Sequence, residues 1–344
     1  MSALLEVDGL EVDYGTARAL DGADLRVAAG EAVGVVGESG SGKSTLGAAI
    51  GRLLPRQAVV AAGSVRVAGE PVLDLPPAAL RRLRRQRLGF VFQDPIASLD
   101  PTMRVGAQLR LVLRAHGRDG RSGRDGSERP DGREGRQGPQ GPDGRAGLQA
   151  QVAFHLERVK LDDPRVATAY PHQLSGGMAQ RVAIALAMAA SPELLVADEP
   201  TASLDSQVRE EVLNVVFALA RQAGTSIVWL SHDLPAVARR CDRVAVMYAG
   251  RVVESGPAAD VLGDPVHPYT AALARSAPAV AVPGVRLEPV PGRPPVLTGP
   301  SPGCAFAPRC PFAEDRCATE RPEPVRVGAK DVLCHRAAEL EVIA

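Results

Sequence analysis

Residues 37–45 read Gly-Glu-Ser-Gly-Ser-Gly-Lys-Ser-Thr, a stretch that decides the fold. It fits the pattern G-x-x-x-x-G-K-[ST], in which backbone N–H groups wrap nucleotide phosphates, the lysine reaches the β and γ oxygens, and the next hydroxyl binds Mg²⁺. A buried strand is expected before it at 32–36, and a helix after it at 46–54, ended by Pro55. This order predicts a nucleotide-binding α/β core. The expected contact residues are Gly37, Glu38, Ser39, Gly40, Ser41, Gly42, Lys43, Ser44 and Thr45.

Two carboxylates end a short apolar run at residues 194–200, Leu-Leu-Val-Ala-Asp-Glu-Pro. Such a run is typical of a parallel strand covered on both faces, and ligands collect at the carboxyl ends of these strands. We expect Asp198 to hold Mg²⁺ through water, and Glu199 to orient and polarise the attacking water. The alternative is a solvated strand end without function, which is weakened because the phosphate loop supplies both acids with a partner.

A third stretch, residues 174–181, reads Leu-Ser-Gly-Gly-Met-Ala-Gln-Arg and opens a predicted helix. Free N–H groups and the positive helix end can bind an anion at such a place. A serine before glycines is also an ordinary helix N-cap. Taken alone, the N-cap is the better interpretation.

Three single residues near predicted strands are weaker candidates. Gln93 follows the apolar run 90–92, and its amide could contact the metal and the lytic water. His232 follows the predicted strand 226–230 and could contact the γ-phosphate, although a lone histidine is more often a structural donor. Tyr14 could stack on adenine, although an isolated tyrosine is usually a packing residue.

Length and composition bound the class of protein. With 344 residues and 45% hydrophobic residues, the chain is expected to form one large domain with a smaller appendage. Basic and acidic residues number 40 each, which gives no support for a nucleic-acid partner. No secretory signal is visible, and apolar runs such as 182–190 fall short of the ~18 residues that span a bilayer. We therefore expect a cytoplasmic location, with any membrane role exerted through a partner.

Several segments suggest how the chain is organised. Residues 4–12 and 19–27 alternate apolar and polar side chains and are predicted to be antiparallel strands. Residues 116–147 are mostly polar, Gly and Pro, and cannot bury enough surface to fold, so we expect a disordered loop insertion, with a regulatory tether as the alternative. Residues 283–303 read as a linker. A domain boundary is expected near residue 260.

The order of these motifs resembles that of ATP-binding-cassette (ABC) ATPases, over roughly residues 3–260. The order is Tyr14, the phosphate loop, Gln93, residues 174–181, Asp198-Glu199, Asp205 and His232. The resemblance implies a P-loop cassette over residues 1–259 with a RecA-like core, an antiparallel β layer, and a helical subdomain at about 94–181. It also implies ATP and Mg²⁺, with Glu199, His232 and Gln93 as catalytic residues. The implied metal ligands are Ser44, Gln93 and Asp198.

In that family two cassettes sandwich two ATP molecules head to tail. The resemblance therefore implies that the signature residues contact ATP bound to a partner chain, and that Asp205 lies in the family's D-loop. The implied signature contacts are Ser175, Gly176, Gly177 and Gln180. Ala179 departs from the basic residue that many relatives carry.

Finer resemblance points to the cassettes of dipeptide, oligopeptide and nickel importers. It rests on residues 92–101, 171–173, 267–270 and 303–311. It implies a peripheral ATPase subunit on the cytoplasmic face of the cell membrane, paired with a second cassette, either a homologous subunit or another copy. The other implied partners are two permeases and, indirectly, an extracytoplasmic substrate-binding protein. The function it implies is ATP hydrolysis that drives import of dipeptides or oligopeptides. The alternatives are a nickel importer, a soluble non-transport ABC ATPase, and a regulatory cassette that hydrolyses ATP poorly.

Four of the five cysteines lie in the predicted C-terminal extension, residues 260–344. They are Cys304, Cys310, Cys317 and Cys334. No C-x-x-C pair is present among them, so a zinc ribbon is a poor match. The resemblance implies a [4Fe–4S] cluster on the four thiolates, while zinc and free thiols stay open as alternatives. A disulfide is disfavoured by the expected cytoplasmic location.

Overall fold

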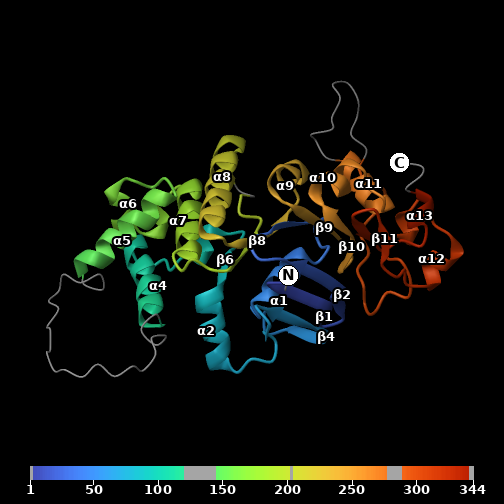
Figure 1. Ribbon diagram of the computed structural model, residues 1–344, viewed down its shortest axis with the longest axis horizontal. Helices are drawn as coiled ribbons and strands as arrows, with labels where there is room; N and C mark the ends of the chain where they lie inside the picture. Colours follow the sequence, from blue (N-terminus) through green and yellow to red (C-terminus); the bar gives the residue numbers. More distant parts are fainter. Residues whose placement is uncertain (1–2, 120–144, 202–203, 277–288, 341–344) are drawn as a thin grey trace. The chain divides into compact units, whose positions relative to one another are not determined.

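The computed structural model describes residues 3–119, 145–201, 204–276 and 289–340. The chain packs as two compact units (Figure 1). The first contains Met1–Leu80, Val196–Glu199 and Ser226–Ala344, and the second contains Arg81–Leu195 and Pro200–Thr225. Among the described residues, no helix is both long enough and apolar enough to cross a membrane.

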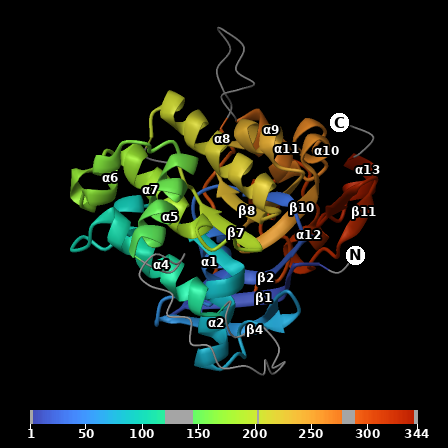
Figure 2. The same cartoon turned by 60° about the vertical axis from the view of Figure 1, so that its left-hand side comes forward.

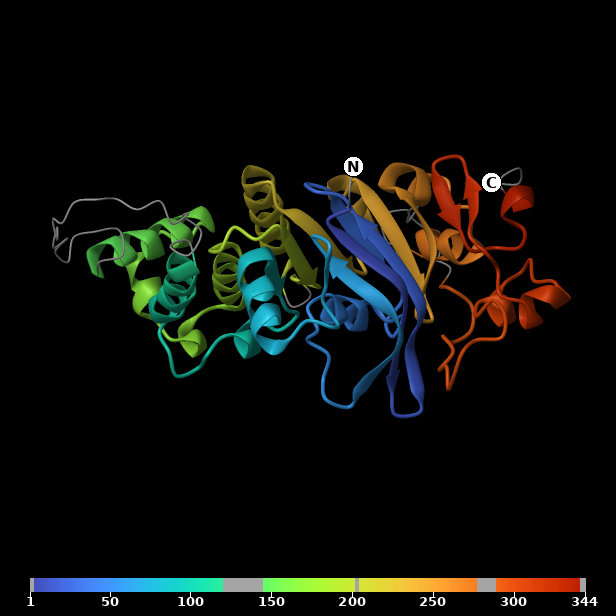
Figure 3. The same ribbon diagram turned by 60° about the horizontal axis from the view of Figure 1, so that its bottom comes forward.

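An antiparallel sheet forms one layer of the first unit, in the order β2-β1-β4-β5. Its strands are β1 (Leu5–Tyr14), β2 (Ala17–Val27), β4 (Ala58–Val67) and β5 (Glu70–Pro71). β1 and β2 pair from Tyr14↔Ala17 to Leu5↔Val27, which confirms the antiparallel pairing predicted for this region. Figure 3 shows these blue strands side by side. Gly15, with φ 59°, takes the left-handed conformation that the tight turn between them needs.

A second, mixed sheet carries the centre of this unit, in the order β11-β12-β10-β9-β3-β8-β7. β3 lies between β8 and β9 and is parallel to both, whereas β9 and β10 are antiparallel. β8 is buried along its whole length, as its unbroken apolar sequence predicts. The strands are β3 (Ala32–Val36), β7 (Leu194–Asp198), β8 (Ser226–Ser231), β9 (Arg243–Tyr248), β10 (Arg251–Pro257), β11 (Val325–Val327) and β12 (Lys330–Val332).

Helix α1 begins and ends earlier than the predicted range of 46–54. It spans Lys43–Ile50 and ends at Gly51, well before Pro55, because Arg52 takes a left-handed backbone with φ 52°. The other helices of the unit are α9 (Leu234–Arg240), α10 (Ala258–Gly263), α11 (Pro268–Arg275), η3 (Ala307–Arg309), α12 (Asp315–Thr319) and α13 (Ala337–Leu340).

The C-terminal extension packs into the first unit instead of forming a separate body after residue 260. Its hairpin β11–β12 pairs with β10 through Glu254↔Val332 and Ser255↔Asp331, which adds two short strands to the sheet (Figure 1). The fully buried carboxylate of Asp21 accepts hydrogen bonds from Arg321 and from the backbone N–H of Ser301. The extension is thus tied to the cassette by backbone pairing and by an ion pair with the buried Asp21.

The second unit is largely helical, with α4, α5, α6 and α7 grouped together (Figure 2). β6 (Leu88–Val91) is the neighbour of β7, whose first two residues belong to this unit. The helices are α2 (Pro77–Arg87), which begins in the first unit, α3 (Pro95–Ser98), α4 (Val105–Asp119), α5 (Arg145–Arg158), α6 (Pro164–Thr168), η1 (Pro171–Gln173), α7 (Gly176–Met188) and α8 (Ser206–Ala223).

The predicted insertion at 116–147 is therefore too wide. Residues 116–119 continue α4, and residues 145–147 begin α5. Residues 120–144, for which disorder was predicted, lie outside the described part of the chain.

Candidate nucleotide site

The phosphate loop joins β3 to α1 without an intervening residue of regular structure. Gly42 is the N-cap of α1 with φ 105°, a conformation that favours glycine. A Cβ atom on Gly37 would lie 2.1 Å from the carbonyl oxygen of Met247. The backbone can approach β9 this closely only because glycine stands at position 37, so the loop is held tightly against the sheet.

Lys43 is folded back over the loop that precedes it. Its Nζ donates to the carbonyl oxygens of Gly37 at 2.8 Å and Glu38 at 3.0 Å. The side chain is buried, which lowers the pKa of Lys43, while the nearby carboxylates of Glu199 and Asp198 act in the opposite direction. The ammonium group of Lys43 places a positive charge at the start of α1, where it would attract an anionic ligand such as a phosphate.

Asp198 ends β7 close to Lys43 and to the first turn of α1. Burial raises the pKa of Asp198, and a hydrogen bond from the Ser44 hydroxyl opposes this rise. Its Oδ1 atom is buried and has no hydrogen-bond partner among the described residues. Because buried carboxylate oxygens are normally paired, this oxygen and the Ser44 hydroxyl fit the hard-oxygen ligands of Mg²⁺.

Glu199, the second acidic residue of the site, contacts His232. His232 Nδ1 lies 3.0 Å from Glu199 Oε1, and the Glu199 side chain is 20% exposed against 62% for His232. The backbone N–H of Glu199 donates to the Leu230 carbonyl at 2.9 Å. Glu199 has φ 42°, a left-handed conformation that costs energy for a residue with a side chain. The backbone of Glu199 is therefore held by β8, and its carboxylate is held by the histidine.

Tyr14 near the phosphate loop was predicted from the sequence, whereas the residues that contact Glu38 in the loop were not. Tyr14 is the last residue of β1, half-buried and paired with Ala17 and Ala58. Glu38 accepts hydrogen bonds from Arg309 of the C-terminal extension, and its backbone N–H donates to the Tyr269 hydroxyl. Sequence reasoning missed Arg309 and Tyr269, because both lie more than 200 positions away along the chain and match no nucleotide motif.

In the second unit, residues 175–177 start helix α7. Ser175 is its N-cap and accepts a hydrogen bond from the Met178 N–H at 3.3 Å. Gly177 allows close packing of α7 on α8, since a Cβ there would lie 2.8 Å from Val208. Gln180 is only 1% exposed in this unit. Its contact with ATP on a partner chain stays a prediction.

The other two predicted residues of this unit lie on exposed segments. Gln93 is exposed and follows β6. Asp205 is the N-cap of α8 and accepts a hydrogen bond from the Val208 N–H at 3.0 Å. Its observed contact is therefore a helix cap.

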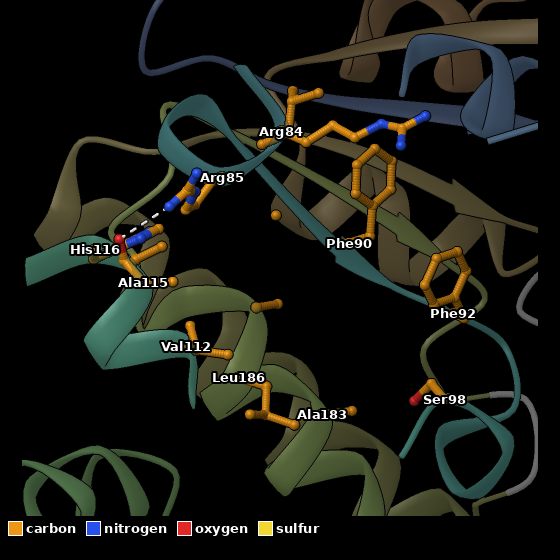
Figure 4. Close-up of a pocket in the computed structure, with 14 residues that line it drawn as sticks. Arg84, Arg85, Phe90, Phe92, Ser98, Val112, Ala115, His116, Ala183 and Leu186 are labelled. Carbon is orange, nitrogen blue, oxygen red and sulfur yellow. Dashed lines mark hydrogen bonds between the residues drawn. The ribbon is translucent and has the colours of Figure 1, made fainter. Parts of the chain in front are cut away.

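A cavity of about 330 Å³ opens beside β6 in the second unit. Figure 4 shows Phe90 and Phe92 on one side and Val112, Ala183 and Leu186 on the other. The two phenyl rings are stacked with centroids 6.0 Å apart, and Phe92 is 45% exposed. An apolar opening with an exposed aromatic side chain at its edge is typical of a protein-binding surface.

The four cysteines of the extension line one small cavity of about 20 Å³. Burial raises the pKa of Cys304 and Cys310, and raises that of Cys334 to about 11. Among the described residues, no group of three or more His, Cys, Asp or Glu side chains is placed to hold a metal ion. The thiols are thus gathered but, in this arrangement, do not form a ligand set.

The fold and the first unit's site define a P-loop nucleotide-binding protein. A family model described as ABC transporter matches residues 20–202, and one described as oligopeptide/dipeptide transporter, C-terminal region, matches residues 253–317. The chain belongs to the ABC transporter family.

Relatives and solved structures agree with this membership. The chain is 42% identical to an oligopeptide transport ATP-binding protein of Mycobacterium tuberculosis over 98% of this chain, but it spans only 52% of that protein. It is 38% identical to a dipeptide transport ATP-binding protein of Haemophilus influenzae, covering 97% of this chain and 95% of the relative. An ATP-binding cassette solved as a dimer after hydrolysis, with ADP and phosphate bound, is 27% identical with a TM-score of 0.59, covering 74% of this chain and 98% of that one.

Proposed function

We propose that this ABC ATPase powers the import of dipeptides or oligopeptides across a bacterial cytoplasmic membrane. The observation that carries the proposal is the cluster of Lys43, Ser44, Asp198, Glu199 and His232 at the carboxyl ends of β3, β7 and β8. The peptide class is supported by the match of residues 253–317 and by the names of the relatives. These relatives favour peptide over nickel or a non-transport role.

Each side chain of the cluster has a distinct part in hydrolysis. The N–H groups of residues 37–45 and the ammonium of Lys43 hold the β and γ phosphates of ATP. Glu199 orients the attacking water, and its hydrogen bond to His232 fixes the carboxylate and brings the imidazole to the γ-phosphate. Ser44, Asp198 and Gln93 would hold Mg²⁺, which neutralises developing phosphate charge. Tyr14 stacks on the adenine.

The signature region completes the site of a second cassette. The first turn of α7, beginning at Ser175, Gly176 and Gly177, offers free N–H groups to the γ-phosphate held by the partner. The Ser175 side chain is already engaged as the N-cap, so the anion contact comes mainly from the backbone. Asp205 shapes the loop before α8 at this interface. The partner is a second copy or a homologous subunit.

The apolar cavity beside β6 is the docking place for a cytoplasmic helix of a permease. Phe92 directly precedes Gln93 and Phe90 lies in the same short segment, so a helix seated there would be linked to a predicted catalytic residue. Two such permeases would hold the cassettes on the cytoplasmic face of the membrane. An extracytoplasmic binding protein would deliver the solute.

The catalytic assignment is tested with Glu199→Gln in the chain assembled with its permeases. We expect ATP binding to be retained and turnover to fall by at least ~100-fold, since the water-orienting carboxylate is lost. Glu314→Gln, an exposed acid of the extension, is the matched control and should keep full turnover. Normal turnover of Glu199→Gln would refute the assignment. If no permease co-purifies with the chain, the transport role is refuted.

For the cysteine cavity we propose a [4Fe–4S] cluster, supported by the four thiols that share one cavity. Because the thiols as placed do not form a ligand set, binding would require them to rearrange. Anaerobic purification followed by visible spectroscopy and iron and zinc analysis tests this. A broad iron–sulfur band that is lost in Cys317→Ser supports the proposal, whereas stoichiometric zinc or metal-free protein refutes it.

A further inference from the structure

Arg309 of the C-terminal extension makes a two-pronged contact with the phosphate loop. Its Nη1 donates to Glu38 Oε2 at 2.8 Å, and its Nη2 donates to Glu38 Oε1 at 3.1 Å. The side chain of Arg309 is 5% exposed and that of Glu38 is 23% exposed. A forked, largely buried arginine–carboxylate pair is stronger and geometrically more specific than a surface ion pair.

The guanidinium of Arg309 is itself fixed on all sides by the first unit. Its Nε and Nη2 donate to the carbonyl oxygens of Pro291 and Val290. Its Nη1 also donates to the Tyr248 hydroxyl at 3.2 Å, and its carbon Cζ lies 5.6 and 5.8 Å from the ring centroids of Tyr248 and Phe306. Arg309 therefore presents a rigid fork to the loop.

Glu38 connects this fork to the lysine of the nucleotide site. The carbonyl oxygens of Glu38 and of its neighbour Gly37 accept the two shorter hydrogen bonds of Lys43 Nζ. The Glu38 N–H donates to the Tyr269 hydroxyl at 2.8 Å, so two helices of the extension, α11 and η3, both hold this position. A shift of Glu38 would move two of the three groups that orient Lys43.

We propose that Arg309 is a positioning residue for ATP: by holding and neutralising Glu38, it keeps the loop 37–45 in the shape that receives the phosphates. An unpaired Glu38 carboxylate beside this loop would also repel the anionic nucleotide. The inference rests on the proposed function, in that it takes residues 37–45 as the phosphate site.

The same contact makes the ATP site sensitive to the local structure of the extension. Arg309 lies in the short helix η3, whose turn starts with the Ala307 N–H donating to the Cys304 carbonyl, and Cys310 is its C-cap. Two of the four cavity-lining cysteines thus frame the residue that holds Glu38. A chemical change at these cysteines would shift Arg309 and thereby alter the binding of ATP.

Arg309→Ala and Arg309→Lys in the full-length chain test the proposal, with ATP affinity and the split between KM and kcat as readouts. We expect Arg309→Ala to raise the KM and Kd for Mg·ATP about tenfold, with kcat within about twofold of the unaltered chain. The KM and Kd of Arg309→Lys should lie between those of the unaltered chain and of Arg309→Ala, because lysine cannot make a bidentate contact with a carboxylate. Adding Glu38→Gln to Arg309→Ala should cause no further loss and restore part of the affinity, since the unpaired carboxylate is gone. Arg326→Ala, at an exposed arginine of the extension paired with Asp331, should leave KM unchanged.

A merely structural role would give a different result. If Arg309→Ala lowers the thermal midpoint but leaves the KM and Kd for ATP unchanged, or if Glu38→Gln adds fully to its effect, the positioning role is refuted. Lys43→Ala separates this failure from failure of the phosphate-site assignment. Loss of ATP binding in Lys43→Ala with unchanged binding in Arg309→Ala refutes only the inference about Arg309. Normal binding in Lys43→Ala refutes the phosphate site itself.

Discussion

At the scale of single residues, the buried oxygen of Asp198 that lacks a protein partner gives a direct prediction about magnesium. Replacing Asp198 with Asn removes the charge but keeps the shape, so we expect the Mg²⁺ concentration for half-maximal ATPase activity to rise roughly 10- to 100-fold, as befits a lost charge-assisted contact. An ATPase titration with Mg²⁺ at saturating ATP measures this. Asp331→Asn, an exposed acid in the same unit, is the control, and an unshifted curve for Asp198→Asn would contradict the metal role.

Sequence motifs predicted the acidic residues and the lysine of the site, but they could not predict the distant residues that hold the phosphate loop in place. Lys43, Asp198 and Glu199 stand in motifs whose spacing follows from strand, loop and helix geometry. The contact from Arg309 to Glu38 joins positions 271 residues apart, and it exists only because the extension folds back onto the first unit. The burial of Gln180 was hidden for a related reason, because which face of α7 is covered depends on packing that the local sequence does not specify.

At the scale of elements, the start of helix α11 depends on a buried neutral histidine. His267 is 1% exposed, and its Nδ1 accepts the Tyr269 N–H as the N-cap. Burial lowers the pKa of His267 from 6.5 to about 3. Between these values the unfolded chain binds a proton that the folded chain rejects, so stability is full above pH 6.5 and falls with decreasing pH by about 1.4 kcal/mol per unit.

His267→Asn tests this pH dependence, since asparagine can cap the helix and does not titrate. We expect the thermal midpoint of the unaltered chain to fall more steeply between pH 6.5 and 4.5 than that of the variant. Parallel curves would mean that His267 is charged in the folded chain or that it does not contribute to stability.

Element boundaries show where local pattern fails. Strands β1, β3, β7 and β8 have alternating or unbroken apolar sequences, and their positions were predicted closely. β11 and β12 have three residues each, too few for any period, and they form strands only because β10 offers them a free edge.

At the scale of the whole molecule, the division into units separates the two halves of the proposed reaction. The phosphate loop, Asp198, Glu199 and His232 belong to the first unit, while Gln93 and the signature helix belong to the second. The sequence predicted a division near residue 260, ahead of the Pro- and Gly-rich residues 283–303. Packing instead joins the extension to the first unit, through pairing with β10 and the buried Asp21. Amino-acid composition can indicate a linker, but it does not show which unit the segment after the linker packs against.

The last prediction concerns assembly driven by ATP. If the signature helix completes a partner's site, then trapping ATP should bring two cassettes together, so we expect Glu199→Gln with Mg·ATP to double its mass from 36.0 kDa in light scattering. Adding Lys43→Ala should abolish the shift by removing ATP binding, and Ser175→Tyr should abolish it by blocking the signature surface while ATP still binds. If the mass stays at that of one chain but doubles when a homologous cassette is added, the partner is that homologue. A doubling that survives Ser175→Tyr would show that the two chains meet through some surface other than the start of α7.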